Sequence, residues 1–290
     1  MDKTNKKVIV GMSGGVDSSV SAYLLKQQGY EVIGLFMQNW QNEPGEVCTS
    51  EIDFKDASDV CDRLDIPLHR AKDTNKDQTY FLHEVKESEF KKCIFPLADL
   101  TKNEVREIAK KLGLNVSTKK DSVGICFVGE KNMKDFIGRF IKLSKGPIYD
   151  EKNEILGEHN GATLYTIGQR QGLQLGGVSG KDDLPWYVYK KDIKNNIVYV
   201  CQGVDNELLF SSGLECEKIS WINDNFQKDE LKCLVQIRHQ HIPVNCKISH
   251  HKNKHIIKFS EDIRGVAPGQ SAVFYDDNMC LGGGIISKAF

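Results

Sequence analysis

The chain has 290 residues, of which 40% are hydrophobic and 27% charged, with a formal net charge of −1. This length allows two or three domains with buried cores. No apolar run approaches the ~20 residues of a membrane-spanning helix, and the first apolar run is too short for the core of a signal peptide. Nine scattered cysteines favour mostly buried thiols. We therefore expect a cytoplasmic protein without a membrane partner.

The small net charge conceals two basic stretches. Residues 100–142 carry ten Lys and Arg against five Asp and Glu, and residues 218–258 carry eight against three. Such stretches favour a polyanionic partner such as nucleic acid. Ordinary solvated surfaces are the alternative.

The first seventy residues alternate apolar segments with amphipathic ones, which favours a β-α-β-α-β order and a parallel sheet. Gly29 is expected to end the first helix as a C-cap. The expected strands are Lys7–Gly11, Glu31–Met37 and Ile66–Arg70, and the expected helices are Ser18–Gln28 and Ile52–Leu64.

This alternation stops after Arg70, where a polar loop follows. A nucleotide-binding sheet of this kind normally has two such halves, and only one is visible here. The sheet would expose an edge where a fourth strand should pair.

Later segments change character along the chain. A helix is expected at Thr101–Leu112, opened by a capping box of Thr101 and Glu104, and a short helix at Asn132–Ile141. Short strands are then expected within residues 146–159, 162–168 and 186–203. From Leu214 onward, period-2 alternation favours a small antiparallel barrel.

These patterns predict an α/β protein with three domains. A parallel-sheet domain, internally shortened after residue 70, spans 1–142, a central domain spans 143–213, and a C-terminal antiparallel β-barrel spans 214–290.

The loop between the first strand and the first helix reads Gly11-Met-Ser-Gly-Gly-Val-Asp-Ser-Ser19. Small residues here let backbone N–H groups approach an anion at the helix N-terminus. The loop lacks the lysine of G-x-x-x-x-G-K-S/T and does not fit G-x-G-x-x-G. The alternative is a tight turn with Asp17 or Ser18 as N-cap.

The string S-G-G-x-D-S-S resembles the PP-loop of ATP pyrophosphatases. Further segments, among them FPLADLTKNEVREIA (Phe95–Ala109), KKDSVGICFVGE (Lys119–Glu130) and PGQSAVFYDDNMCLGGGII (Pro268–Ile286), are similar to the tRNA 2-thiouridylases of the MnmA family. The likeness runs through nearly the whole chain. It implies a PP-loop (Rossmann-like) first domain.

In that family ATP adenylates the C2 oxygen of the wobble uridine, and a cysteine persulfide then delivers sulfur. The resemblance assigns the persulfide to Cys126, and implies ATP with Mg²⁺, a tRNA substrate and a sulfur-donating carrier or desulfurase. The residues it assigns to ATP are Gly11, Met12, Ser13, Gly14, Gly15, Val16, Asp17, Ser18 and Met37.

The resemblance also implies tRNA contacts at Lys76, Asp77, Gln78, Arg238 and His239. His239 stands where the family usually has Tyr, and its flat ring keeps the ability to stack. The histidines from His239 to His255 lie near Cys233 and Cys246, but no C-x-x-C pair is present and no zinc site is expected.

The family normally continues for several dozen residues between Arg70 and Ala71, with a P-N-P-D…C-N motif that supplies an Asp and a first cysteine. Neither that motif nor the family's T-G-H turn occurs here. Three explanations are open. The segment is missing only from this sequence, or the chain uses Cys126 with another thiol such as Cys93 or Cys48, or it is a tRNA-binding relative without catalysis. A PP-loop ligase or amidotransferase acting on a small molecule is a further alternative.

Overall fold

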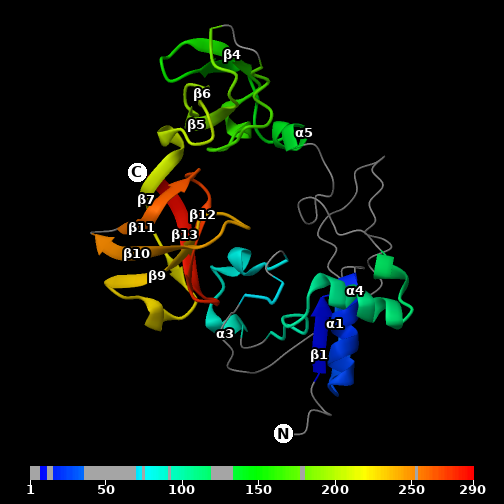
Figure 1. Cartoon of the computed structure of the whole chain (residues 1–290). Helices are drawn as coiled ribbons and strands as arrows, with labels where there is room; N and C mark the ends of the chain where they lie inside the picture. Colours follow the sequence, from blue (N-terminus) through cyan, green and yellow to red (C-terminus); the bar gives the residue numbers. More distant parts are fainter. Residues whose placement is uncertain are drawn as a thin grey trace. The chain divides into compact units, whose positions relative to one another are not determined.

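The computed structural model describes residues 7–11, 16–35, 70–73, 76–90, 93–118, 133–176, 180–251 and 254–290. The chain divides into two compact units, Met1–Glu130 with Asn278–Cys280, and Lys131–Asp277 with Leu281–Phe290 (Figure 1). No helix within the described residues is long and apolar enough to cross a membrane.

The first unit opens with a β-α-β arrangement. Strands β1 (Lys7–Gly11) and β2 (Glu31–Leu35) pair in parallel, and helix α1 (Val16–Gln27) connects them. Leu25 of α1 packs with Val8 and Val10 of β1. This confirms the parallel pairing predicted for these segments.

The ends of α1 show where the sequence pattern was reliable. Gly29 has a φ of +86° and follows the helix as a C-cap, as predicted. The helix begins at Val16 and not at Ser18, because Val16 is buried in the contact with a later helix. Asp17 and Ser18 therefore lie in the first helical turn, and the alternative that either is the N-cap is wrong.

The later helix is α4 (Lys102–Lys111), and its predicted capping box is present. The Thr101 side chain accepts from the Glu104 N–H, and the Glu104 carboxylate accepts from the Thr101 N–H. Val105 and Ala109 of α4 pack with Val16 and Val20 of α1, and α4 crosses one end of α1 in Figure 1. The remaining short helical elements of this unit are η1 (Thr79–Leu82), α3 (Glu87–Phe90) and η2 (Asn115–Thr118).

Two predicted elements fall where the structure gives no account. The helix at residues 52–64 and the strand at 66–70 lie outside the described residues, apart from Arg70 itself. The prediction of a strand at 31–37 agrees with the structure as far as Leu35.

The second unit begins with helix α5 (Met133–Gly138) and a four-stranded sheet of order β4-β3-β6-β5. Its β3–β6 pair is parallel and its other pairs are antiparallel. Ile148, Val188, Val198 and Val200 are fully buried in its core. The strands are β3 (Gly146–Tyr149), β4 (Ile155–His159), β5 (Trp186–Asp192) and β6 (Ile197–Gln202).

The strand predicted within residues 162–168 is wrong. Residues Ala162–Leu164 form the 3₁₀ turn η3, because the Asn196 side chain accepts the Ala162 N–H and both Ala162 and Tyr165 turn into the core. A turn with 3₁₀ spacing can bury these two side chains without period-2 alternation.

A seven-stranded sheet follows, in the order β12-β9-β10-β11-β7-β13-β8. An additional β12–β13 pairing closes six of these strands into an antiparallel barrel, as predicted. Inward side chains such as Ile248, Ile257 and Phe274 are almost completely buried. The strands are β7 (Phe210–Cys216), β8 (Ser220–Trp221), β9 (Glu230–Gln236), β10 (Val244–His251), β11 (Lys254–Arg264), β12 (Ser271–Asp276) and β13 (Met279–Ala289), with short turns η4 (Glu207–Leu209) and η5 (Asp224–Phe226).

Gly282 of β13 offers a test of the barrel, because it pairs with Trp221 at a φ of +145°. A Cβ there would lie 2.2 Å from the Ser220 carbonyl oxygen. We expect Gly282→Ala to lower the free energy of unfolding by about 2 kcal/mol or more, measured by thermal unfolding followed by near-ultraviolet circular dichroism. Gly176→Ala is the matched control, since its Cβ would meet nothing within 4 Å. Equal melting temperatures for the two variants would contradict this account of Gly282.

Candidate functional site

The expected anion-binding loop leaves β1 at Gly11 and enters α1 at Val16. The amides of the first helical turn have no partner within the helix, and the helix dipole makes this end positive. Ser18 is buried, whereas the Asp17 side chain is half exposed. The described residues on either side of the loop are the end of a strand and the start of a helix, the two elements that flank a phosphate-binding loop.

Lys102, in the first turn of α4, contacts the first turn of α1 from elsewhere in the chain. Its ammonium lies 2.5 Å from the Asp17 carboxylate, and its side chain is only 16% exposed. The loop sequence contains no lysine, and the packing of α4 on α1 supplies a cation at the start of α1. Sequence reasoning missed this residue, although the capping box placed it at the first position of the helix.

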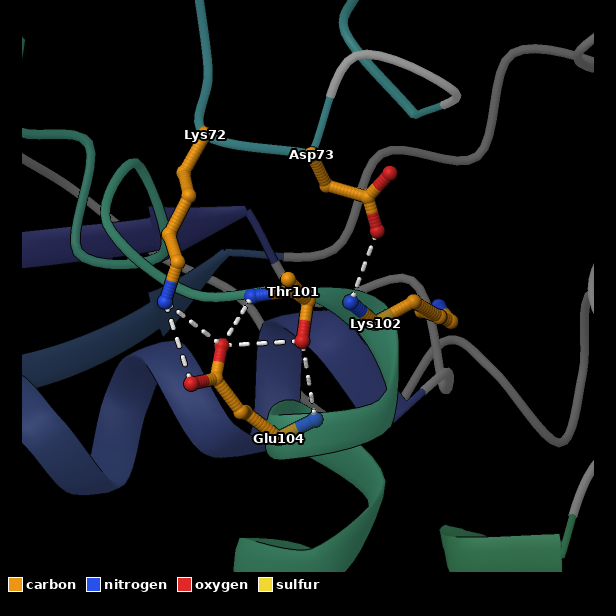
Figure 2. Close-up of polar contacts among 5 residues, drawn as sticks. All are labelled: Lys72, Asp73, Thr101, Lys102 and Glu104. Carbon is orange, nitrogen blue, oxygen red and sulfur yellow. Dashed lines mark hydrogen bonds and ion pairs between the residues drawn. The ribbon is translucent and has the colours of Figure 1, made fainter.

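The same helical turn anchors the segment that follows Arg70 (Figure 2). Asp73 accepts the Lys102 backbone N–H at 2.9 Å, and the Lys72 ammonium donates to both Glu104 carboxylate oxygens at 3.0 Å. Glu104 also accepts from the Thr101 N–H at 2.6 Å and from its hydroxyl at 2.8 Å. Residues 72–73 are thus attached to the start of α4.

These contacts change the pKa of the Glu104 carboxyl group. The Thr101 backbone N–H, then the Thr101 hydroxyl and then Lys72 lower the pKa of Glu104 from 4.5 to about 2. Each donor stabilises the ionised carboxylate.

The predicted contact residues Lys76, Asp77 and Gln78 divide into two groups. Asp77 is buried, and its carboxylate accepts from the Ala71 N–H at 3.0 Å and from the Thr79 hydroxyl at 2.6 Å. Lys76 and Gln78 are exposed on either side of it. In this structure Asp77 orders the segment, and its two neighbours face solvent.

Arg238 and His239 lie in the second unit, in the connection between β9 and β10. Both are partly buried. The Arg238 guanidinium donates to the Arg264 carbonyl at 3.3 Å. Burial, with a contribution from the Arg238 charge, lowers the pKa of the nearby His241.

Arg264 is a second arginine at this place, and sequence reasoning missed it because it lies outside both basic stretches. Its guanidinium stacks over the Tyr187 ring at 4.5 Å and donates from Nε to the Val204 carbonyl at 3.1 Å. In the described part of the chain, neither Arg238 nor Arg264 forms an ion pair. Two unneutralised guanidinium groups at one place can bind phosphate oxygens.

Several predicted site residues lie outside the described residues. The structure describes Val16, Asp17 and Ser18 at the start of α1, close to Lys102. It gives no account of most of the other residues predicted to bind ATP, or of the predicted persulfide cysteine. Those outside are Met12, Ser13, Gly14, Gly15, Met37 and Cys126.

Comparison with known families matches all three parts of the chain. A tRNA methyl transferase HUP domain model matches residues 6–70 and 66–130, and a tRNA methyl transferase PRC-barrel domain model matches residues 134–202. An aminomethyltransferase beta-barrel domain model matches residues 211–286.

Comparison with individual proteins decides the family. The chain is 37% identical to the tRNA-specific 2-thiouridylase MnmA of Photorhabdus laumondii, over 99% of this chain and 98% of that protein. It is 40% identical to the protein of the same name from Legionella pneumophila (strain Lens), over 97% and 98%, and 39% identical to that of Buchnera aphidicola subsp. Schizaphis graminum, over 99% and 99%. The chain belongs to the MnmA family.

Within the MnmA family this chain is short in its interior. The three alignments run over 361, 355 and 363 positions but cover only 97–99% of the 290 residues of this chain, so each contains about 75 positions where this chain has no residue. The HUP domain model matches in two stretches that meet at residues 66–70. These two findings agree with the prediction that an interior segment is missing near Arg70.

The lowered pKa of Glu104 gives a pH prediction. A carboxylate whose pKa is lower in the folded state stabilises that state above pH 4.5, and this stabilisation is lost as the pH falls from 4.5 to about 2. We expect carbon NMR of the Glu104 carboxyl group to titrate near pH 2, and Lys72→Met to raise the midpoint by removing one donor. A midpoint near 4.5 in the unaltered protein would contradict the contacts in Figure 2.

Proposed function

We propose that this protein is a tRNA-uridine 2-sulfurtransferase. The observation that carries this function is the similarity of 37–40% identity to tRNA-specific 2-thiouridylases over 97–99% of the chain. The reaction adenylates the C2 oxygen of the wobble uridine with ATP and then replaces that oxygen with sulfur. The urea-like C2 oxygen is a poor leaving group, whereas AMP is a good one. Adenylation therefore makes C2 susceptible to attack by sulfur.

The strand–loop–helix at β1 and α1 is proposed as the ATP site. The residues proposed to hold ATP are Gly11–Ser18 and Met37, and the structure supports this with the exposed Asp17 carboxylate and the adjacent Lys102 ammonium. Mg²⁺ bound through Asp17 would neutralise pyrophosphate charge. Lys102 is placed to exchange its Asp17 partner for a phosphate oxygen, since both are anionic acceptors.

Cys126 is the proposed persulfide carrier. Its terminal sulfur attacks C2 of the adenylated uridine, and AMP leaves. A second thiol then attacks the Cys126 sulfur, the S–S bond breaks, and the outer sulfur stays on C2 as 2-thiouridine. The protein disulfide that remains must be reopened by a reductant. Within this chain the candidates for the second thiol are Cys93, which is exposed, and Cys48. A sulfur-donating carrier or desulfurase would load Cys126.

The proposed domains are 1–142 for ATP and catalysis, 143–213 for the central domain and 214–290 for the barrel. Contacts to tRNA are proposed for Lys76, Asp77, Gln78, Arg238 and His239. The proposed location is the cytoplasm, where tRNA and ATP are available.

A second function is favoured by the missing interior segment. The family's P-N-P-D…C-N motif does not occur in this chain, and a chain without it can bind tRNA while its thiolation is lost or greatly reduced. Under this hypothesis the protein is a relative of the thiouridylases that binds tRNA without modifying it.

Cys126→Ser separates the two functions. For the enzyme, we expect this variant to lose 2-thiouridine formation by roughly a thousandfold or more, measured by mass spectrometry of tRNA nucleosides. Because tRNA binding and ATP cleavage precede sulfur transfer, the variant should keep tRNA affinity and tRNA-dependent pyrophosphate release. If the unaltered chain binds tRNA but forms no 2-thiouridine when ATP and a persulfide donor are supplied, the tRNA-binding function holds instead. Turnover equal to that of a relative with the segment would contradict the expected cost of its loss.

Arg238 tests the proposed tRNA contact in the second unit. We expect Arg238→Ala to weaken tRNA binding about tenfold and to reduce the slope of log K against log salt by about one, measured by fluorescence anisotropy at several salt concentrations. Lys194→Ala is the matched control, because it removes one exposed positive charge from a turn of the other sheet. His239→Tyr should retain affinity, since both rings can stack. An equal loss of tRNA affinity in the Arg238 and Lys194 variants would contradict a specific contact at Arg238, because any exposed positive charge would then have the same effect.

A further inference from the structure

Two cysteines face each other across the hairpin of β9 and β10. Cys233 and Cys246 are directly opposite in the antiparallel register, and their sulfur atoms are 3.6 Å apart. Cys246 is 6% exposed and Cys233 is partly buried. Along the ladder, the cysteine pair is two positions away from the Val235–Val244 pair. The connection that carries Arg238 and His239 follows Val235 at that end of the hairpin.

The backbone geometry is compatible with a disulfide. Directly opposite residues of an antiparallel pair have Cα atoms about 4.5–5.5 Å apart, which falls within the range of about 4.4–6.8 Å seen in disulfides. The two sulfur atoms must approach from 3.6 Å to about 2.05 Å. Small rotations of the two side chains supply this movement without a change of register.

We propose that Cys233 and Cys246 form an oxidisable dithiol, which peroxide converts into a disulfide across the hairpin. The Cys233 thiolate attacks one peroxide oxygen, the O–O bond breaks, and hydroxide leaves as Cys233 becomes a sulfenic acid. The Cys246 thiol then attacks the Cys233 sulfur, the S–O bond breaks, and the Cys246 proton joins the departing hydroxyl group to form water. The hydroxide from the first step takes up the proton that Cys233 released. Two thiols and one hydrogen peroxide thus give one disulfide and two waters.

The two sulfur atoms have different roles because their surroundings differ. The contact with Cys233, followed by burial, raises the pKa of Cys246, which therefore remains a thiol and can donate its S–H to the Cys233 sulfur. Cys233 is the more exposed of the two and is the one that peroxide can reach. Cys233 is therefore the attacking thiol and Cys246 the resolving one.

Two other thiols of the second unit provide internal controls. Cys201 and Cys216 are fully buried, and burial raises the pKa of each to about 12. Among the described residues, neither sulfur lies against another sulfur. Both should remain reduced under conditions that oxidise the Cys233–Cys246 pair.

The test is peroxide treatment of the full chain, alkylation of the remaining thiols, and digestion with trypsin without reductant. Cleavage after Lys232, Arg238 and Lys247 places the two cysteines in different peptides, residues 233–238 and 239–247. We expect these peptides to be joined by a bond that a reductant breaks, with a joint loss of alkylation at Cys233 and Cys246. Cys201 and Cys216 should remain fully alkylated.

Single variants assign the order of attack. In Cys246→Ser, Cys233 should accumulate as a sulfenic acid that dimedone traps, whereas in Cys233→Ser, Cys246 should stay reduced. Circular dichroism checks that each variant is folded, and the linked peptide from the unaltered chain tests the proposal without any variant. Recovery of both cysteines in alkylated form, oxidation of Cys233 to sulfinic acid without the linked peptide, or pairing of either residue with a different cysteine would overturn it.

Discussion

The described part of the first unit depends on the contacts that the first turn of α4 makes with other segments. This turn packs α4 against α1, and its Thr101–Glu104 capping box binds Lys72. Its Lys102 contacts both Asp73 and Asp17. One turn of helix therefore joins the start of α1, which follows the expected phosphate-binding loop, to the segment that follows Arg70. These two parts are separated by more than fifty residues in the chain, so the joining depends on tertiary contacts and not on local sequence.

The sequence correctly predicted those structural elements that are determined by residues close to one another in the chain. The capping box at Thr101, the C-cap at Gly29 and the alternation in β9 and β10 each lie within a few residues of the element they define. The misplaced start of α1 and the false strand at 162–168 have another cause. In both, a buried contact with a distant segment decided the conformation, through Val16 against α4 and Ala162 against Asn196.

The same distinction applies to the candidate site. The glycine-serine string and the Arg238-His239 pair could be recognised because each is continuous in sequence. Lys102 and Arg264 could not, because each reaches its place only through folding: one by the packing of two helices, the other by stacking on Tyr187 of a different sheet. Asp77 shows the converse, since its position in a contact motif gave no sign that its carboxylate holds Ala71 and Thr79.

The closure of the barrel has a consequence for how the protein is made. Leu214 of β7 pairs with both Ile257 and Ala289, and β12 joins β9 across Val273 and Gln236. Pairs so distant in sequence form slowly, because much chain entropy is lost before they contribute. The ribosome must release the whole of residues 210–289 before the barrel can close. Until then β7 and β9 remain as open edges, which can pair with strands of other chains.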